Sequence, residues 1–295
     1  MKLSHYGKFY SIFYICNLIF LIALALLCVL PLINILSVSL STSHYAAAGL
    51  VSFWPVGFTT ASYDVALGDP RFWNAFLISI NRTVIGSAIN LILTILVAYP
   101  LSKDTRYFPA RNRYMMYIFI TMMFHGGLVP TFLVVFHTGL YDSLWALILP
   151  GAVNAWFIVL MLNFFRQLPK EIEEAAIIDG ANHVIILFRI ILPVSKASIA
   201  TITLFAMVGH WNSWFDGMIY SRTPAGYPLA TYLQSLLTVD VARQMPQQAA
   251  EIMALLNTRT LRAAVVFLNA LPIIMVYPFL QKYFAKGLVL GSVKG

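Results

Sequence analysis

The stretch LPKEIEEAAIIDGANHVIILFRIILPVSKASI, residues 168–199, is a polar insert between two apolar runs, and it determines the expected fold. Pro169 suits the first turn of a helix, and the three glutamates within residues 171–174 follow where the helix dipole favours negative charge. Gly180 permits a break in the backbone, and Pro193 ends the insert. The stretch predicts a helical hairpin of the soluble type inside an otherwise apolar protein.

The composition of the remaining chain is that of a membrane protein. Of 295 residues, 60% are apolar and only 10% are charged, and the mean hydropathy is +0.80. Soluble domains have a charged share of roughly one quarter, so this chain cannot cover itself with polar surface. We therefore expect an all-α integral membrane protein with about six transmembrane helices, because a span takes about 20 apolar residues.

Apolar runs mark six predicted spans within one transmembrane domain of residues 1–295. The spans are residues 13–37, 72–101, 114–136, 144–165, 197–220 and 263–284. The intervening parts are a cytoplasmic loop at 166–196, an outer loop at 221–260 and a tail at 285–295. The first apolar run is too long for a cleaved signal peptide, so we interpret it as an anchor. The second is interrupted by Arg82, for which the sequence suggests no role.

The outer loop contains four residues typical of turns and two short amphipathic stretches. The stretches are LATYLQSLL at residues 229–237 and AAEIMALLN at residues 249–257. Both are predicted to be interfacial or lid-like helices, and ordinary surface packing explains them equally well.

The distribution of basic residues orients the spans. The net charge of +8 comes from short clusters between apolar runs, which favours membrane orientation over nucleic-acid binding. With the N-terminus in the cytoplasm, the inner side holds thirteen Lys and Arg residues and the outer side five, three of them in the long outer loop and a fourth, Arg262, just after it. The inner set is Lys2, Lys8, Lys103, Arg106, Arg111, Arg113, Arg166, Lys170, Arg189, Lys196, Lys282, Lys286 and Lys294. The outer set is Arg71, Arg222, Arg243, Arg259 and Arg262. Both termini are predicted to be cytoplasmic.

The chain has no motif for ATP hydrolysis or metal chemistry. The P-loop pattern is absent, and the one Gly-Lys pair, Gly7 with Lys8, is followed by Phe9. We therefore expect a non-enzyme that binds no cofactor or metal of its own. A proton-coupled transporter usually has titratable groups within its spans, and here the polar candidates are Asp216, Arg82, His125 and His210. Each could line a transport path, but a packed helix-end group that finds one hydrogen-bond partner is the favoured interpretation.

The insert strongly resembles the EAA loop of ABC importer permeases. Nine residues match the family spacing EAAxxDGAx(8)IxLP: Glu174, Ala175, Ala176, Asp179, Gly180, Ala181, Ile190, Leu192 and Pro193. The resemblance implies the type I permease fold and a coupling helix that docks in a cleft of a separate ATPase subunit, where ATP and Mg are bound. Small alanines suit close approach, and carboxylates can pair with donors across such an interface.

Two further passages are similar to carbohydrate importers of the maltose-permease type, in the LplC/YtcP-like branch. They are FHGGLVPTFLVV at residues 124–135 and YFAKGLVLGSVKG at residues 283–295. The resemblance implies a bacterial inner-membrane complex with a second permease, two ATPase subunits and an extracytoplasmic binding protein. It also implies that the tail reaches the interface of the two ATPase subunits. That tail consists of Gly291, Ser292, Val293, Lys294 and Gly295.

The substrate path is less defined by the sequence than the loop is. Sugars are bound by aromatic faces and hydrogen-bonding groups, so Asn154, Trp211, Asn212 and Trp214 are candidates, the asparagines ahead of the tryptophans. Interfacial packing explains the tryptophans equally well. Branches of the family include importers of acidic oligosaccharides such as alginate or pectin fragments. The alternatives are an ABC permease for a non-sugar solute and an ion-coupled secondary transporter.

Overall fold

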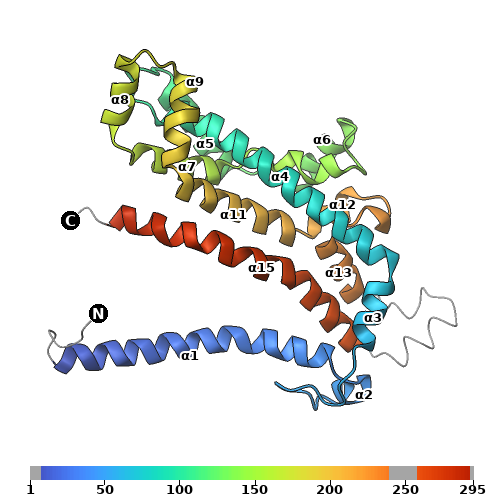
Figure 1. The fold of residues 1–295 in the computed structure, drawn as a ribbon. Coiled ribbons are helices and arrows are strands. Elements are labelled where there is room, and N and C mark those ends of the chain that lie inside the picture. The colour runs from blue at the N-terminus through green and yellow to red at the C-terminus, as the bar shows by residue number, and fades with distance from the viewer. Residues whose placement is uncertain (1–7, 239–257, 293–295) are drawn as a thin grey trace. The chain divides into compact units, whose positions relative to one another are not determined.

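The computed structural model describes residues 8–238 and 258–292, and these residues form helices joined by turns, with one isolated bridge between Ser41 and Phe58 (Figure 1). The α-helices are α1 (Lys8–Ser39), α2 (Ser43–Ala47), α3 (Ala61–Gly68), α4 (Pro70–Ser102), α5 (Arg111–Met123), α6 (Leu128–His137), α7 (Ala155–Arg166), α8 (Lys170–Ile178), α9 (His183–Ile185), α10 (Leu192–Val194), α11 (Lys196–Asn212), α12 (Phe215–Tyr220), α13 (Leu229–Thr238) and α15 (Thr258–Ser292). Short 3₁₀ turns are η2 (Leu144–Leu147), η3 (Leu149–Gly151) and η5 (Pro224–Gly226), and η4 (Ile186–Ile191) is a π-helical turn.

Within residues 8–238 and 258–292, three helices are long and apolar enough to cross a membrane, and the number rises to six if each of three bent helix pairs is one span. The single helices are α1, α4 and α15. The architecture is that of an all-α integral membrane protein, as the composition predicts. The limits of the individual spans stay predictions, because the helix ends do not by themselves locate a bilayer.

Two of the three bent pairs divide spans that the sequence predicts to be continuous, and the third bend lies at the end of the predicted loop 166–196. Helices α5 and α6 meet at 111°, where Gly127 has a φ of +87° that favours glycine. The 3₁₀ turns η2 and η3 meet α7 at 50°, where Asn154 is extended and caps α7. The segment 183–194 meets α11 at 82° around Ser195. The predicted fifth span is also interrupted at Ser213, which is extended.

Most of the buried residues of helix α4 are small or polar, the reverse of a soluble helix. They lie at helical spacing: Ala75, Ser79, Arg82, Thr83, Gly86, Ser87, Asn90, Thr94 and Ala98. The larger buried residues of the helix are Phe72, Ile95, Tyr99 and Leu101. Its exposed apolar residues include Trp73, Leu77, Val84 and Leu96. Small residues let membrane helices approach closely. At Gly86 the approach is extreme, since a Cβ there would lie 2.6 Å from the ring of His210.

The described residues form two compact units. The first consists of residues up to 70 and of 235–270, and the second of 71–234 and of residues from 271 onward. In the first unit, Val38, Ala46 and Val51 form a small core. Ser39 is hydrogen-bonded to the Tyr63 hydroxyl at 2.7 Å, and Arg259 donates to the Ala46 carbonyl at 3.0 Å. The apolar surface of α1 is largely exposed, as expected of a helix whose surroundings are lipid.

The main core lies in the second unit and joins predicted spans to the predicted loop. It contains Ile95, Ala98 and Tyr99 of α4, Phe157, Ile158, Met161, Leu162 and Phe165 of α7, Ile202 and Ala206 of α11, and Ala176, Ile186, Leu187 and Ile191 of the insert. Helix α7 packs against both α5 and α11. The insert is therefore built into the same core as the spans.

The prediction for residues 229–237 coincides with α13, whereas residues 249–257 lie outside the described residues. Gly291 and Ser292 form the last turn of α15, and Val293, Lys294 and Gly295 lie outside the described residues.

Candidate functional site

The insert is a helical hairpin whose turn is set by residues of the DGAN sequence. Helix α8 ends at Asp179, and Gly180 follows with a φ of +81°. The Ala181 amide donates to the Ala176 carbonyl at 2.9 Å, and the Gly180 amide donates to the Ile177 carbonyl at 3.0 Å. These two bonds are the Schellman pattern, which satisfies carbonyls that a helix end leaves unpaired. Gly180 is therefore required by the backbone geometry of the turn.

The second arm of the hairpin begins with a cap and contains an irregular turn. The side chain of Asn182 accepts a hydrogen bond of 2.9 Å from the Ile185 amide, which satisfies a free donor at the helix start. The π-helical turn η4 ends directly before Leu192 and Pro193. Proline has no N–H for the carbonyl four residues earlier, so a regular α-helix cannot continue through this point unchanged.

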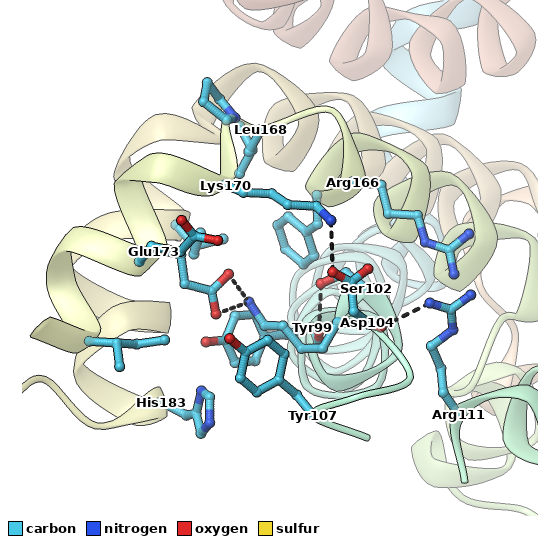
Figure 2. A pocket seen from close by; sticks show the side chains of 16 residues that line it. Tyr99, Ser102, Asp104, Tyr107, Arg111, Arg166, Leu168, Lys170, Glu173 and His183 are labelled. Carbon is cyan, nitrogen blue, oxygen red and sulfur yellow. Dashed lines mark hydrogen bonds and ion pairs between the residues drawn. The ribbon is translucent and has the colours of Figure 1, made fainter. Parts of the chain in front are cut away.

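An ion pair joins α8 to the residue directly after α4. Lys103 donates to the two carboxylate oxygens of Glu173 at 2.6 and 2.5 Å, and its ammonium lies 4.0 Å from the centre of the Tyr99 ring (Figure 2). The two side chains are mostly buried, at 12% and 21% exposed. Burial lowers the pKa of Lys103, while the hydrogen bond and charge of Glu173 act in the opposite direction. Because the pair is largely removed from solvent, it should hold α8 against α4 more firmly than an exposed pair could.

A second pair joins the same two elements at the surface. Lys170 donates to Asp104 at 2.7 Å (Figure 2). The hydrogen bond and charge of Lys170 lower the pKa of Asp104, and those of Asp104 raise the pKa of Lys170. Both side chains are exposed, so solvent screens their attraction.

A pocket of about 380 Å³ lies where α8 faces the end of α4, and Figure 2 shows its lining. Tyr99, Lys103, Arg111, Arg166 and Glu173 are among its lining residues. Arg111 donates to the Lys103 carbonyl at 3.0 Å and Arg166 to the Leu101 carbonyl at 3.4 Å, so both guanidinium groups bind carbonyls near the end of α4. Within the described residues, no three His, Cys, Asp or Glu side chains meet as a metal site.

The hairpin has one face in the core and one face that is exposed in the described part of the chain. Ala176, Ile186 and Ile191 are buried against α4, α7 and α11. The opposite face is apolar and exposed, and Ile178 is 85% exposed. The exposed apolar residues of the hairpin are Ile172, Ile177, Ile178, Val184, Ile185, Phe188 and Val194, and of these Ile177 also lines the pocket beside α4. A surface of this composition on a tightly packed hairpin is typical of a protein-binding site.

Comparisons with known proteins agree with this geometry. The chain is 39% identical to Protein LplC of Bacillus subtilis over 293 residues, which are 99% of this chain and 98% of the relative. It is 38% identical to the polygalacturonan/rhamnogalacturonan transport system permease protein YtcP of the same organism, over 94% of this chain and 96% of the relative. No family model matches the chain.

The chain is also similar to a chain of a solved structure. It is the crystal structure of a bacterial ABC transporter involved in the import of the acidic polysaccharide alginate. One of its chains matches with a TM-score of 0.84 and 33% identity, over 95% of this chain and 99% of that chain. This chain belongs to the permease family of carbohydrate ABC importers. The comparisons do not favour an ion-coupled transporter for this permease.

The coupling residues predicted from the sequence divide between the two faces of the permease hairpin. Glu174, Ala175 and Asp179 are exposed, whereas Ala176 is buried at 8% exposure. The remaining residues of the predicted set are Gly180 and Ala181 in the turn and Leu192 and Pro193 at the end of the second arm. The two alanines of the EAA sequence thus differ: one packs into the core and the other lies on the surface.

The four residues predicted for the substrate path do not share one cavity. Asn154 lines a pocket of about 390 Å³ among α4, α7, α11 and α12, whose lining does not include the other three. Trp211 is buried with its ring edge-on to Phe76, at a centroid distance of 6.1 Å. Asn212 and Trp214 are exposed at the break between α11 and α12.

The structure gives Arg82 a partner that the sequence analysis did not identify. Its guanidinium forms an ion pair with Asp216 through both oxygens and donates to the Ser213 carbonyl at 3.0 Å. The contact joins α4 to the break between α11 and α12 of the permease. The two residues are 134 positions apart, and the only sequence signal was that each is a charge within an apolar run.

Proposed function

We propose that this chain is the membrane subunit of an ABC importer that moves oligosaccharides into the cytoplasm by alternating access, driven by separate ATPase subunits. The chain itself catalyses no reaction in this proposal, and ATP and Mg are bound by the partner ATPase subunits. The observation on which the proposal rests is the hairpin of α8 to α10, which presents an exposed apolar face while its other face is part of the core.

The exposed face supports docking of a protein partner. Ile178 and Val184 would otherwise hold apolar area in water, which costs free energy in proportion to the area. Glu171, Glu174 and Asp179 are exposed acids of the hairpin, and they can accept hydrogen bonds from basic side chains or amides of an ATPase subunit. Glu173 is already paired with Lys103, so it serves the attachment of the hairpin instead.

The buried face explains how movement of the partner would reach the spans. Ala176 and Ile186 pack in the same core as Tyr99 of α4 and Phe165 of α7. Close-packed cores deform little and pass displacement on to their neighbours. A push on α8 would therefore move α4, α7 and α11 together, and this would change the access of a central path from one side of the membrane to the other.

We further propose the assembly that the family implies: a second permease, two ATPase subunits and an extracytoplasmic binding protein, in a bacterial inner membrane. Both termini and the hairpin lie in the cytoplasm in this proposal, following the excess of basic residues on that side. The C-terminal residues Gly291 to Gly295 would extend toward the interface of the ATPase subunits.

We propose oligosaccharides as the substrates, with acidic ones such as pectin or alginate fragments first among those to test. The support is the polygalacturonan/rhamnogalacturonan permease at 38% identity and the alginate transporter at 33% identity. Of the candidate path residues, Asn154 has the strongest support because it lines the pocket among the helices.

The test is the ATPase activity of the full complex in liposomes, with and without the loaded binding protein. Ile178→Arg and Glu174→Lys should each abolish most of the stimulation while the complex stays assembled, because the first adds a charge to the docking face and the second reverses one. Ile178→Val and Glu174→Gln are the matched controls and should keep most of it. Stimulation and uptake unchanged in both charged variants would contradict docking at this face.

A further inference from the structure

The pocket of about 390 Å³ collects polar groups from four predicted spans. Arg82 comes from the second, His125 from the third, Asn154 from the fourth and Asp216 from the fifth. Polar groups are expensive at membrane depth unless they meet each other or a water-filled path. The volume lies within the range of small-molecule sites, about 300–1,000 Å³. The convergence of these polar groups on one cavity is therefore evidence for a binding site.

In the ion pair of Arg82 with Asp216, the acid is accessible from the pocket and the base is buried. The Asp216 side chain is 24% exposed and the Arg82 side chain only 3%. One carboxylate oxygen of Asp216, Oδ1, already accepts from Arg82, from the Ser213 hydroxyl at 2.9 Å and from the Gly217 amide at 2.9 Å. The other, Oδ2, accepts from Arg82. A carboxylate oxygen has two lone pairs, so Oδ2 retains room for one further donor.

Two other residues supply donors to the same pocket. The Asn154 oxygen is used as the cap of α7, accepting from Phe157 at 3.2 Å, which leaves the Nδ2 amide hydrogens for a ligand. In His125, Nδ1 accepts from the Gly127 amide at 3.2 Å, so the neutral ring has its proton on Nε2. The pocket therefore offers a ligand a charged acceptor, Asp216, and donors from Asn154 and His125.

An exposed aromatic ring completes the lining. Phe205 of α11 is 41% exposed and lines the pocket, and Gly209 lies one turn further on the same face. A Cβ added at Gly209 would meet nothing within 4 Å, so the helix is open on this side. An aromatic face beside hydrogen-bonding groups suits a ring with one apolar face and many hydroxyls.

We propose that this pocket binds a sugar unit of the transported oligosaccharide through its hydroxyl groups, with Asp216 as acceptor, Asn154 and His125 as donors, and Phe205 against the apolar face of the sugar. A carboxylate of an acidic sugar would meet Asp216 before the buried Arg82, so an acidic sugar unit binds here with its carboxylate directed away from Asp216. This inference deepens the proposed function and rests on it. It assigns this subunit a direct part in the choice of substrate.

The first test blocks the pocket without changing its polar groups. In the reconstituted complex with binding protein and ATP, Gly209→Leu should fill the open space and lower the sugar moved per ATP hydrolysed by about tenfold or more, since an added side chain excludes ligand atoms. Gly68→Leu is the control, because Gly68 lies outside the pocket lining and an added Cβ there also meets nothing within 4 Å, and it should keep the wild-type ratio. Binding-protein stimulation of the ATPase should persist in both, since the docking hairpin is untouched. An unchanged ratio in Gly209→Leu would overturn the proposal.

A second test replaces a donor and reports occupancy directly. Asn154→Asp keeps the cap of α7 but removes the amide donor, so it should also lower the transport ratio. In a chain with Cys16 and Cys28 replaced by serine, trigalacturonate, an alginate trisaccharide or maltotriose should slow maleimide labelling of Phe205→Cys during turnover. Labelling of Phe215→Cys, an exposed position outside the pocket lining, should not change.

The outcomes separate the two proposals. If none of the three sugars protects Phe205→Cys while ATP-driven uptake of one of them proceeds, the pocket assignment is wrong and the importer function stands. If the docking-face variants Ile178→Arg and Glu174→Lys leave ATPase stimulation intact, the proposed docking of the ATPase at the hairpin is wrong, whatever the labelling shows.

Discussion

Helix α4 makes an ion pair near its middle and another directly after its end, and the two differ mainly in burial. Arg82 is 3% exposed and binds Asp216 between α11 and α12, whereas Lys103 is 12% exposed and binds Glu173 on the hairpin. A third pair, Lys170 with Asp104, is fully exposed to solvent. The cost of breaking a pair rises with burial, because a lone charge must then remain in a poor solvent. The comparison indicates that the inner pair fixes the break between α11 and α12 beside the pocket, and that the outer pairs attach the hairpin that we propose to dock on the ATPase.

The largest effect should follow removal of the acid from the inner pair. Asp216→Ala leaves the Arg82 guanidinium buried without its partner, which should destabilise the fold by about 3–5 kcal/mol. The double variant Arg82→Gln with Asp216→Asn retains a neutral hydrogen-bonded pair and should recover most of the loss. Thermal unfolding of the purified complex measures both. Equal stability of Asp216→Ala and wild type would show that the pair is not structural.

The next effect concerns the attachment of the hairpin. Glu173→Gln leaves the Lys103 ammonium largely buried with only a neutral acceptor, so it should cost about 1–3 kcal/mol and weaken ATPase stimulation. Glu171→Gln, on the same helix but exposed, is the matched control and should change little. If the two variants behave alike in unfolding and in stimulation, the distinction between paired and docking acids is wrong.

A smaller effect tests the turn of the hairpin. Gly180→Ala places a side chain at a φ of +81°, which should cost about 1–2 kcal/mol and lower stimulation in part. The control is Gly151→Ala, since a Cβ at Gly151 meets nothing within 4 Å and its φ is not positive. Both variants are compared by the unfolding temperature and by the stimulated ATPase rate. A larger loss of unfolding temperature and ATPase rate in Gly151→Ala than in Gly180→Ala would show that the turn conformation at Gly180 is not important.

The smallest effect belongs to the exposed pair, and it depends on pH. The folded pKa of Asp104 lies below its ordinary value, so the contribution of this group to stability is present at neutral pH and is lost as pH falls through that lowered pKa. The folded pKa of Lys170 is raised, so its contribution is lost only as pH rises through that raised value. The difference in unfolding temperature between wild type and Asp104→Asn should be small at pH 7 and vanish in acid. A difference that grows in acid would contradict the pairing.

The sequence was sufficient for the fold class and for the hairpin, because both depend on local patterns. Apolar runs of the right length predict spans, and Gly180 and Pro193 have local backbone consequences. It was not sufficient for the bend at Gly127, because two glycines permit a bend without requiring one. Nor could it pair Arg82 with Asp216, since that contact depends on how α4 packs against the α11–α12 break. The exposure of Ala175 and the burial of Ala176 also depend on packing alone.

Photo-crosslinking from residue 178 tests the central claim most directly. A photoreactive amino acid replaces Ile178, which is 85% exposed on the hairpin, and a control replaces Trp54, which is 83% exposed and predicted to lie on the outer side. Illumination of the assembled importer should join residue 178 to the ATPase subunit and residue 54 to no ATPase subunit. Adducts of residue 178 with lipid or with the other permease alone, in a complex that still hydrolyses ATP, would contradict the claim that this face receives the motion of the ATPase.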